Sequence, residues 1–193
     1  MKLSILIPSL EKREYVFKRL KRSLREQINA LGVQDSVEIL SDIDNGQKKI
    51  GTKRNDLLQR ASGEYVAFVD DDDRVSETYI KDILQGLILN PDVLTLKGVY
   101  TVRGGNPKTF LHSIMFNGWY EQDGILYRYV NHLNCIKREH AIQAGFPEID
   151  FGEDKIYSDR LRKLGILKTE FTVKNTLYYY DYIPKKTRHG YSR

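Results

Sequence analysis

The sequence predicts an α/β protein whose central sheet is mostly parallel and becomes antiparallel in its second half. In the first half, short apolar runs rich in β-branched residues alternate with longer stretches of helical periodicity. That alternation is typical of parallel strands joined by right-handed crossovers. In the second half, aromatic and glycine-rich segments replace it, which indicates hairpins. We therefore expect one domain over residues 1–183, followed by a basic tail over residues 184–193.

The first half begins with a strand and an amphipathic helix. Residues 3–7 form a short apolar run, and we expect Pro8 and Ser9 to end it because proline cannot continue a central strand. A helix is predicted over residues 12–31, with Gly32 as its C-cap. Its expected buried face consists of apolar residues at helical spacing: Val16, Leu20, Leu24, Ile28 and Leu31.

Two further strand–helix pairs complete the first half. A second strand is predicted over residues 37–40, followed by a polar turn over 41–46 and a helix over 52–61. The third strand covers residues 65–69, and Ser76 is the expected N-cap of the next helix. The buried face of that helix is predicted to consist of Tyr79, Ile80, Ile83, Leu84, Leu87 and Ile88.

The second half has a weaker pattern. A strand over residues 93–102 is expected to form a hairpin with residues 109–115, across a turn that contains two glycines and a proline. Residues 116–129 lack periodicity and indicate a loop region with an irregular strand. The remaining elements are expected to be a strand, two helices and two strands, at 131–136, 137–144, 152–164, 166–169 and 176–182.

The composition is that of an ordinary soluble protein with a moderate positive charge. A net charge of +5 and a pI near 9.1 permit an anionic partner without requiring one. The single cysteine, Cys135, excludes an internal disulfide and a cysteine-based zinc site. No stretch approaches the roughly 20 apolar residues of a membrane span, and the N-terminal apolar run is too short for a signal peptide. We therefore expect a cytoplasmic protein, in the host cytoplasm if it is viral.

Four consecutive aspartates, Asp70 to Asp73, directly follow the third predicted strand. Adjacent carboxylates repel one another, and burying them unpaired is costly. A divalent cation removes that cost, because hard cations bind carboxylate oxygens. Ligands of open α/β sheets bind at the carboxyl ends of the strands. The stretch therefore favours a metal ion that holds phosphates over the alternative of a solvated acidic turn.

Three segments, in this order, resemble the motifs of family 2 glycosyltransferases. They are SILIPSL at residues 4–10, Lys53-Arg54-Asn55 followed by ASGEYVAFVDDDD, and Gly152-Glu153-Asp154 shortly after AGFPE. The resemblance extends from residue 3 to about residue 182, and it implies the GT-A fold, a Rossmann-type sandwich. It also implies a nucleotide-sugar-binding half over residues 1–103 and an acceptor-side half over residues 104–183.

On the nucleotide side, the resemblance implies that Pro8, Ser9 and Leu10 line the nucleotide. Asp42 would accept a hydrogen bond from the base, for example from a uracil imide, and its alternative role is that of a turn or cap residue. Arg54 would lie near the base or the diphosphate, and its alternative role is that of a surface arginine.

The resemblance distributes the aspartates after the third strand between sugar and metal. It implies that Asp70 and Asp71 contact the ribose and neighbouring basic groups. Asp72 would bind Mn²⁺ or Mg²⁺, which would in turn hold the diphosphate. His189, in the basic tail, is a candidate to close over the diphosphate or to bind the metal, although a disordered tail is the simpler expectation.

On the acceptor side, the resemblance implies that Asp154 is the general base. An inverting transfer needs a carboxylate to take the proton of the attacking hydroxyl. The alternative is that Glu153 and Asp154 only stabilise the N-terminus of their helix. Trp119, His132 and Glu153 are the candidates for binding the acceptor.

The leading interpretation is a metal-dependent inverting glycosyltransferase that uses a nucleoside-diphosphate sugar, expected to be a UDP-sugar. The acceptors considered are a polysaccharide, a glycan or a modified DNA base. One alternative is a nucleotidyltransferase, although residues 8–11 lack the glycine-rich phosphate loop of that class. Another is a non-catalytic nucleic-acid-binding module, for which residues 178–182 with Lys185 and Lys186 offer a basic aromatic patch.

Overall fold

The computed structural model describes residues 1–183, together with the backbone of residues 186–187 and 190–191. In the tail, β13 (Lys186–Thr187) and β14 (Gly190–Tyr191) pair antiparallel. The expectation for His189 lies outside the described residues, as do the side chains of the basic tail.

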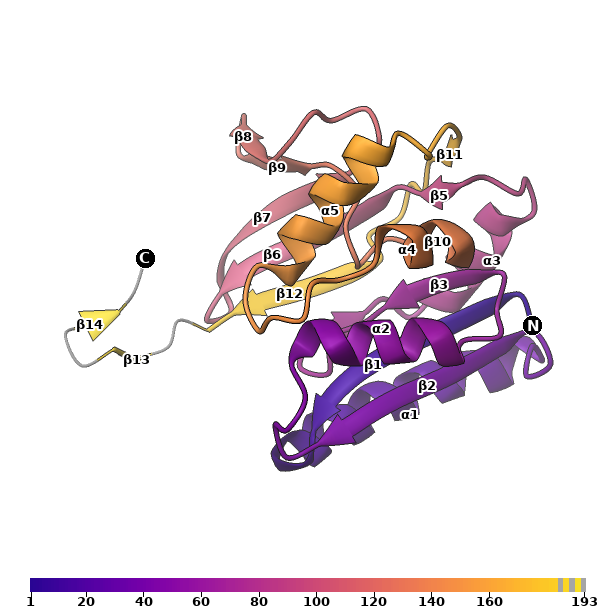
Figure 1. Cartoon of the computed structure of the whole chain (residues 1–193), viewed down its shortest axis with the longest axis horizontal. Coiled ribbons are helices and arrows are strands. Elements are labelled where there is room, and N and C mark those ends of the chain that lie inside the picture. The colour runs from indigo at the N-terminus through magenta and orange to yellow at the C-terminus, as the bar shows by residue number, and fades with distance from the viewer. Residues whose placement is uncertain (184–185, 188–189, 192–193) are drawn as a thin grey trace.

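A six-stranded mixed sheet is built mainly from strands of the N-terminal half (Figure 1). Its strand order is β11-β5-β10-β3-β1-β2, in which β1 runs parallel to both β2 and β3. Strand β10 runs antiparallel between β3 and β5. The strands are β1 (Leu3–Leu10), β2 (Val37–Asp44), β3 (Tyr65–Phe68), β5 (Val93–Leu94), β10 (Ile136–Lys137) and β11 (Glu170–Phe171).

A second six-stranded sheet is built mainly from the C-terminal half, in the order β4-β12-β6-β7-β9-β8. The antiparallel hairpin of β6 and β7 lies at its centre, and β12 runs parallel to β6. The strands are β4 (Arg74–Val75), β6 (Leu96–Val102), β7 (Gly105–His112), β8 (Tyr120–Gln122), β9 (Ile125–Arg128) and β12 (Tyr178–Tyr182). The predicted fold class, parallel at the centre and more antiparallel later, is confirmed.

Helices cover both faces of the first sheet. They are the short 3₁₀ helix η1 (Glu11–Arg13), α1 (Glu14–Leu31), α2 (Ile50–Arg60), α3 (Tyr79–Leu87), α4 (Arg138–Ala144) and α5 (Glu153–Leu164). Within the described residues, none of these helices combines the length and the apolar composition needed to cross a bilayer.

The alternating side chains of β1 divide the core into two layers. Leu3, Ile5 and Ile7 pack with apolar residues of α1 and α3, whereas Leu6 packs with those of α2, α4 and α5. Figure 1 shows α1 and α2 on opposite faces of the sheet. All four β1 side chains are fully buried, and each such Leu or Ile contributes about 1.5–3 kcal/mol. This two-sided burial holds the end of β1 rigidly in place.

The prediction that Pro8 ends the first strand is wrong, because β1 continues to Leu10. Beyond Leu6, β1 pairs only with β2, through Leu10 opposite Asp44. The carbonyl of Leu6 accepts the N–H of Val69, so Leu6 and therefore Pro8 face the side of β3. Since β3 has ended there, the missing N–H of Pro8 breaks no ladder bond.

Several predicted boundaries also need correction. Strand β2 continues through the predicted polar turn to Asp44 because β1 continues beside it. The predicted strand over 93–102 is two strands in different sheets, separated by Thr95. Residues 131–135 are not a strand, because the Asn131 and Asn134 side chains bind the backbone N–H groups that a ladder would need. The strand expected at 166–169 forms instead at 170–171.

The helix faces are correct in phase but not at their ends. Leu20, Leu24 and Ile28 are buried as predicted, and Phe17 takes the place expected for Val16. Leu31 and Ile88, the last residues of the two predicted faces, are 40% and 79% exposed. The N-cap of α3 is Thr78 rather than Ser76, and it makes no side-chain cap bond.

Candidate functional site

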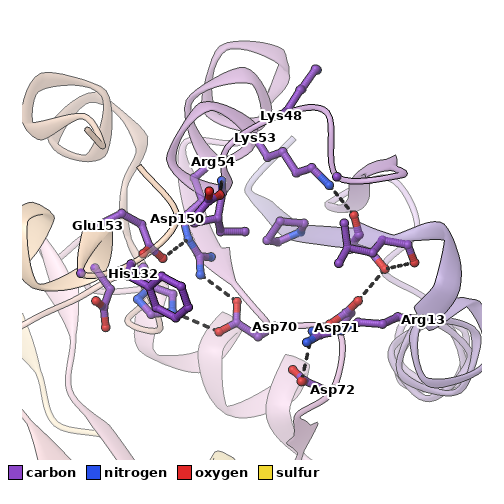
Figure 2. A pocket seen from close by; sticks show the side chains of 18 of the residues that line it. Arg13, Lys48, Lys53, Arg54, Asp70, Asp71, Asp72, His132, Asp150 and Glu153 are labelled. Carbon is purple, nitrogen blue, oxygen red and sulfur yellow. Dashed lines mark hydrogen bonds and ion pairs between the residues drawn. The ribbon is translucent and has the colours of Figure 1, made fainter. Parts of the chain in front are cut away.

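A cavity of about 530 Å³ opens at the carboxyl ends of β1 and β3, opposite the N-terminus of α5 (Figure 2). Strands that run parallel end at the same edge of a sheet, so residues far apart in the sequence meet there. The lining residues come from both halves of the chain: Pro8, Ser9, Leu10, Arg13, Gly46, Lys48, Ile50, Lys53, Arg54, Asp70, Asp71, Asp72, His132, Asp150, Phe151, Gly152, Glu153, Asp154 and Tyr180.

Arg54 links the two halves of the site. Its side chain is 3% exposed, and its Nη2 donates to Asp70 Oδ1 at 2.9 Å while its Nε faces Glu153 Oε1 at 3.4 Å. Figure 2 shows the guanidinium between these two carboxylates. Burial by itself raises the pKa of Asp70, but the charge of Arg54 and the contact with His132 outweigh it and hold the pKa well below its ordinary value. Asp70 is therefore an ionised carboxylate that is already paired.

Asp71 is also fully engaged within the protein. It is 2% exposed, and its two oxygens accept hydrogen bonds from Ser9 Oγ at 2.6 Å and from Arg13 Nη1 at 2.8 Å. Ser9 lies at the end of β1 and Arg13 at the end of η1, so Asp71 fastens the aspartate turn to the first strand and its following helix. We infer that Asp71 shapes the turn.

Of the four consecutive aspartates, Asp72 has the fewest contacts with described residues. Its side chain is 53% exposed, and its ion-pair partner is Arg13, with Nη1 3.1 Å from Asp72 Oδ2. Loss of hydration raises the pKa of Asp72, and the neighbouring charges of Asp71 and Asp70 raise it further, against the opposing effect of Arg13. This carboxylate is therefore less completely paired than those of Asp70 and Asp71.

Within the described residues, no group of three or more His, Cys, Asp or Glu side chains is arranged to hold a metal ion. A Mg²⁺ site that is completed by substrate phosphates needs only one or two carboxylates from the protein. The Asp72 side chain is exposed, whereas Asp70 and Asp71 already accept hydrogen bonds from other side chains. Asp72 therefore fits that role better.

Asp73 lies beneath the pocket and supports the turn. It is 5% exposed, and its Oδ2 accepts a hydrogen bond of 2.8 Å from the Tyr178 hydroxyl, which in turn accepts the backbone N–H of Asp70 at 3.1 Å. Burial raises the pKa of Asp73, and the charge of Asp70 raises it further. The carboxyl therefore favours its neutral form more than a solvated aspartate does.

The loop before α5 is held against the start of α2, and this contact sets the position of Asp154. A Cβ on Gly51 would lie 1.8 Å from the backbone oxygen of Pro147, so only glycine allows this approach. Lys49 Nζ binds Asp150 Oδ2 at 2.7 Å across the same contact. Asp154 lines the pocket from the first turn of α5, where its Oδ1 accepts the N–H of Lys155 at 2.7 Å.

His132 contacts Asp70 from the turn that follows β9. Its side chain is 6% exposed, and its Nε2 lies 3.4 Å from Asp70 Oδ2. Its other ring nitrogen, Nδ1, is buried and has no hydrogen-bond partner among the described residues, and the same holds for Nη1 of Arg54.

Of the predicted site residues that the structure describes, all but two line this pocket. Asp42 does not: it is buried, and its carboxylate accepts a 2.9 Å bond from Lys48 Nζ. Trp119 precedes β8 outside the pocket, 40% exposed, with the Arg128 guanidinium 4.5 Å from its ring centre. The roles of all these residues stay predictions.

Several lining residues were missed by the sequence analysis. Arg13 and Lys48 belong to none of the predicted motifs, and Tyr180 is expected only as part of the basic aromatic patch at residues 178–182. Lys53 is 2% exposed, with its Nζ bound to the carboxylate of Asp44 and to the Ser9 carbonyl at 2.5 Å. The position of Lys53 next to Arg54 in the motif could have identified it as a site residue. Its burial could not be predicted, because it depends on β1 and β2 extending beyond their predicted ends.

Solved glycosyltransferase structures share this fold. S. aureus TarS, residues 1–349, in complex with UDP-GlcNAc matches with a TM-score of 0.65 and 19% identity, over 98% of this chain and 60% of that one. The catalytic domain of Drosophila beta1,4galactosyltransferase 7 in complex with xylobiose matches with a TM-score of 0.54 and 17% identity, over 92% and 68%. The chain thus spans about three fifths of the TarS fragment.

Sequence comparison gives the family. Comparison with curated protein sequences gives no significant match. The family model for glycosyl transferase family 2, however, matches residues 30–146, a segment that includes the Arg54 helix and all four aspartates. Because this segment is more than half of the chain, the protein belongs to glycosyl transferase family 2.

Proposed function

We propose that the protein is a metal-dependent inverting glycosyltransferase that transfers a sugar from a UDP-sugar to a hydroxyl acceptor. Family membership supports sugar transfer in general. The observation that carries the proposal is one pocket in which the strand-end aspartates and Asp154, from opposite halves of the chain, face the same volume. Structures of TarS with UDP-GlcNAc and with UDP, which share the fold, support a uridine nucleotide as the donor.

In this proposal, Pro8, Ser9 and Leu10 line the nucleotide from the end of β1. Lys48 and Arg13, on the same wall, are cations within reach of a diphosphate. Asp72 would hold Mn²⁺ or Mg²⁺, and the bound ion would neutralise the charge that develops on the leaving diphosphate. Asp42 would act on the base only if Lys48 moved away from it, because the two now form an ion pair.

Asp154 is the proposed general base. The acceptor hydroxyl attacks the anomeric carbon on the face opposite the diphosphate, and Asp154 takes the hydroxyl proton as the new bond forms. The α5 N-terminus that carries Asp154 is fixed by the Glu153–Arg54–Asp70 contacts. Positioning of this kind contributes to rate because a displaced base loses its reach to the proton.

Family membership favours this function over the two alternatives. A nucleotidyltransferase would be expected to hold phosphates with a glycine-rich loop after β1, and residues 8–11 contain no glycine. A module that only binds nucleic acid has no role for two carboxylates, Asp72 and Asp154, that line the same pocket.

The experiment is a screen of nucleoside-diphosphate sugars for hydrolysis by the purified chain with Mn²⁺, with Mg²⁺ and with EDTA. Water replaces the acceptor in this assay, so the acceptor need not be known. We expect slow release of UDP from at least one UDP-sugar, abolished by EDTA. Release of nucleoside monophosphate and sugar 1-phosphate, or hydrolysis that is unaffected by EDTA, would contradict the proposal.

A further inference from the structure

A second cavity, of about 820 Å³, joins the first one at Arg13, Asp72 and Tyr180, which line both. It runs between the start of α1 and the strands β4, β6 and β12. Arginines and tyrosines from different elements gather in it: Arg13, Arg19, Arg74, Tyr179, Tyr180 and Tyr182. We call these six residues the arginine–tyrosine groove.

Two of the three arginines in the groove have no described carboxylate within ion-pair distance. In the part of the chain with described side chains, neither Arg19 nor Arg74 forms an ion pair, although Lys18 and Arg22 on the same helix do. Among the described residues, two carboxylates also line this second cavity: Asp72, which faces Arg13, and Asp181. Asp181 accepts hydrogen bonds from the N–H of Gly104 at 2.8 Å and from Thr101 Oγ1 at 2.7 Å; these bonds lower its pKa, and the more distant charge of Arg74 lowers it further. Unpaired guanidinium groups beside a substrate pocket indicate an anionic ligand.

Tyrosine rings line the groove together with these cations. The Arg74 guanidinium lies over the Tyr179 ring at 5.5 Å, and the Tyr180 ring packs against Tyr100 with centres 5.6 Å apart. Strand β4 pairs only with Tyr178 and Tyr179, so in the described part of the chain the edge of β12 beyond them faces the groove unpaired. Cations that track a backbone beside rings that stack on bases are how proteins bind single-stranded nucleic acid.

We propose that the arginine–tyrosine groove binds a single-stranded nucleic acid and presents a nucleotide hydroxyl to the donor pocket as the acceptor. This inference deepens the proposed function and rests on it. Arg19 and Arg74 contact phosphates, and the tyrosines stack on bases. A nucleotide that passes Tyr180 enters the pocket that contains Asp154. A neutral saccharide would leave both arginines unpaired, and a phosphate polymer without bases would not use the rings.

The test is fluorescence anisotropy of a labelled 15-mer of thymidylate with the full chain, from 25 to 200 mM NaCl. The double variant Arg19→Ala/Arg74→Ala removes two phosphate contacts, and each contact contributes about 0.7 to the slope of log affinity against log salt for a single strand. We therefore expect the slope to fall by about 1.4. The matched control Arg22→Ala/Arg25→Ala removes the same charge from α1 outside the groove and is expected to leave the slope unchanged.

The stacking part of the proposal has its own variant. Tyr182→Leu keeps an apolar side chain and removes the ring, and it is expected to weaken binding of the 15-mer about fivefold or more. Inorganic polyphosphate of equal charge, added as a competitor, is expected to displace the 15-mer only weakly. Equal competition, an unchanged Tyr182→Leu affinity, or an equal effect of the control double variant would overturn the proposal.

Calorimetric titration of the wild-type chain with UDP and Mn²⁺ separates the two proposals. If UDP binds and the 15-mer does not bind at 25 mM NaCl, the groove proposal is wrong and the proposed function stands. If the 15-mer binds and no nucleotide does, the proposed function fails instead.

Discussion

Replacement of Arg54 by methionine tests how the two halves of the site are joined. Arg54 is buried and contacts Asp70 at 2.9 Å and Glu153 at 3.4 Å, so its removal leaves two carboxylates without their cation. Loss of one partner from a buried ion pair costs about 3–5 kcal/mol. Because the Asp70 side chain is still 31% exposed, we expect the lower end of that range, about 3 kcal/mol, at pH 7.5.

The stability cost of Arg54→Met is expected to depend on pH. In the wild type, the pKa of Asp70 is held below its ordinary value, so the stability it contributes is present above the unfolded pKa of about 3.9 and is lost only as pH falls below it. Without Arg54, burial raises the pKa of Asp70, and protonation on acidification relieves the unpaired charge. The difference between variant and wild type should therefore shrink between pH 7.5 and pH 4.5.

Urea denaturation at both pH values measures the free energy of unfolding. Arg60→Met, an exposed position on the same helix, is the control and is expected to change stability by less than about 0.5 kcal/mol. Asp70→Asn added to Arg54→Met should recover part of the loss. A cost below about 1 kcal/mol for Arg54→Met, or the same cost at both pH values, would refute the bridging role.

Three further predictions follow from the site. Asp154→Asn should keep the affinity for UDP but lose sugar transfer by about 10²-fold or more, whereas exposed Glu148→Gln should not; near-normal transfer by Asp154→Asn would place the base elsewhere. Gly51→Ala should lower stability by about 1–3 kcal/mol in urea denaturation because its Cβ meets the Pro147 carbonyl, and an unchanged midpoint would contradict that contact. The raised pKa of Asp73 makes the wild type lose stability as pH rises above the ordinary carboxyl value of about 4, and Asp73→Asn should flatten that decline; identical pH profiles would show that Asp73 ionises freely.

The sequence predicts the gathering of carboxylates at the site because that gathering follows from topology. Parallel strands end at one edge, so the aspartates after β3 and the residues at the end of β1 had to meet. Residue chemistry alone does not predict which carboxylate stays exposed, and only the family resemblance distinguishes Asp72 from its neighbours. Asp70 and Asp71 are occupied by Arg54 and Arg13, and these pairings depend on packing between elements far apart in the chain.

The wrong predictions share a physical cause: each depends on which hydrogen bonds and neighbours a residue has in the folded structure. Pro8 ends a strand only if both edges are paired, and β3 stops before that point. The local bonds of Asn131 and Asn134 replace a strand that apolar content alone suggested. Arg19 has the pattern of a solvated helix residue, and only the return of β12 beside α1 makes it part of a groove.

Calorimetric titration of UDP in the presence of Mn²⁺, on the wild type and on Asp72→Asn, tests the central claim most directly. Asn is nearly isosteric with Asp but lacks the charge that a hard cation prefers. We predict that the wild type binds UDP with Mn²⁺ and loses most of that affinity in EDTA, that Asp72→Asn binds weakly under both conditions, and that exposed Asp35→Asn behaves as the wild type. Equal, metal-dependent affinity in Asp72→Asn and the wild type would contradict the assignment of the metal to Asp72, and wild-type binding unaffected by EDTA would contradict metal dependence itself.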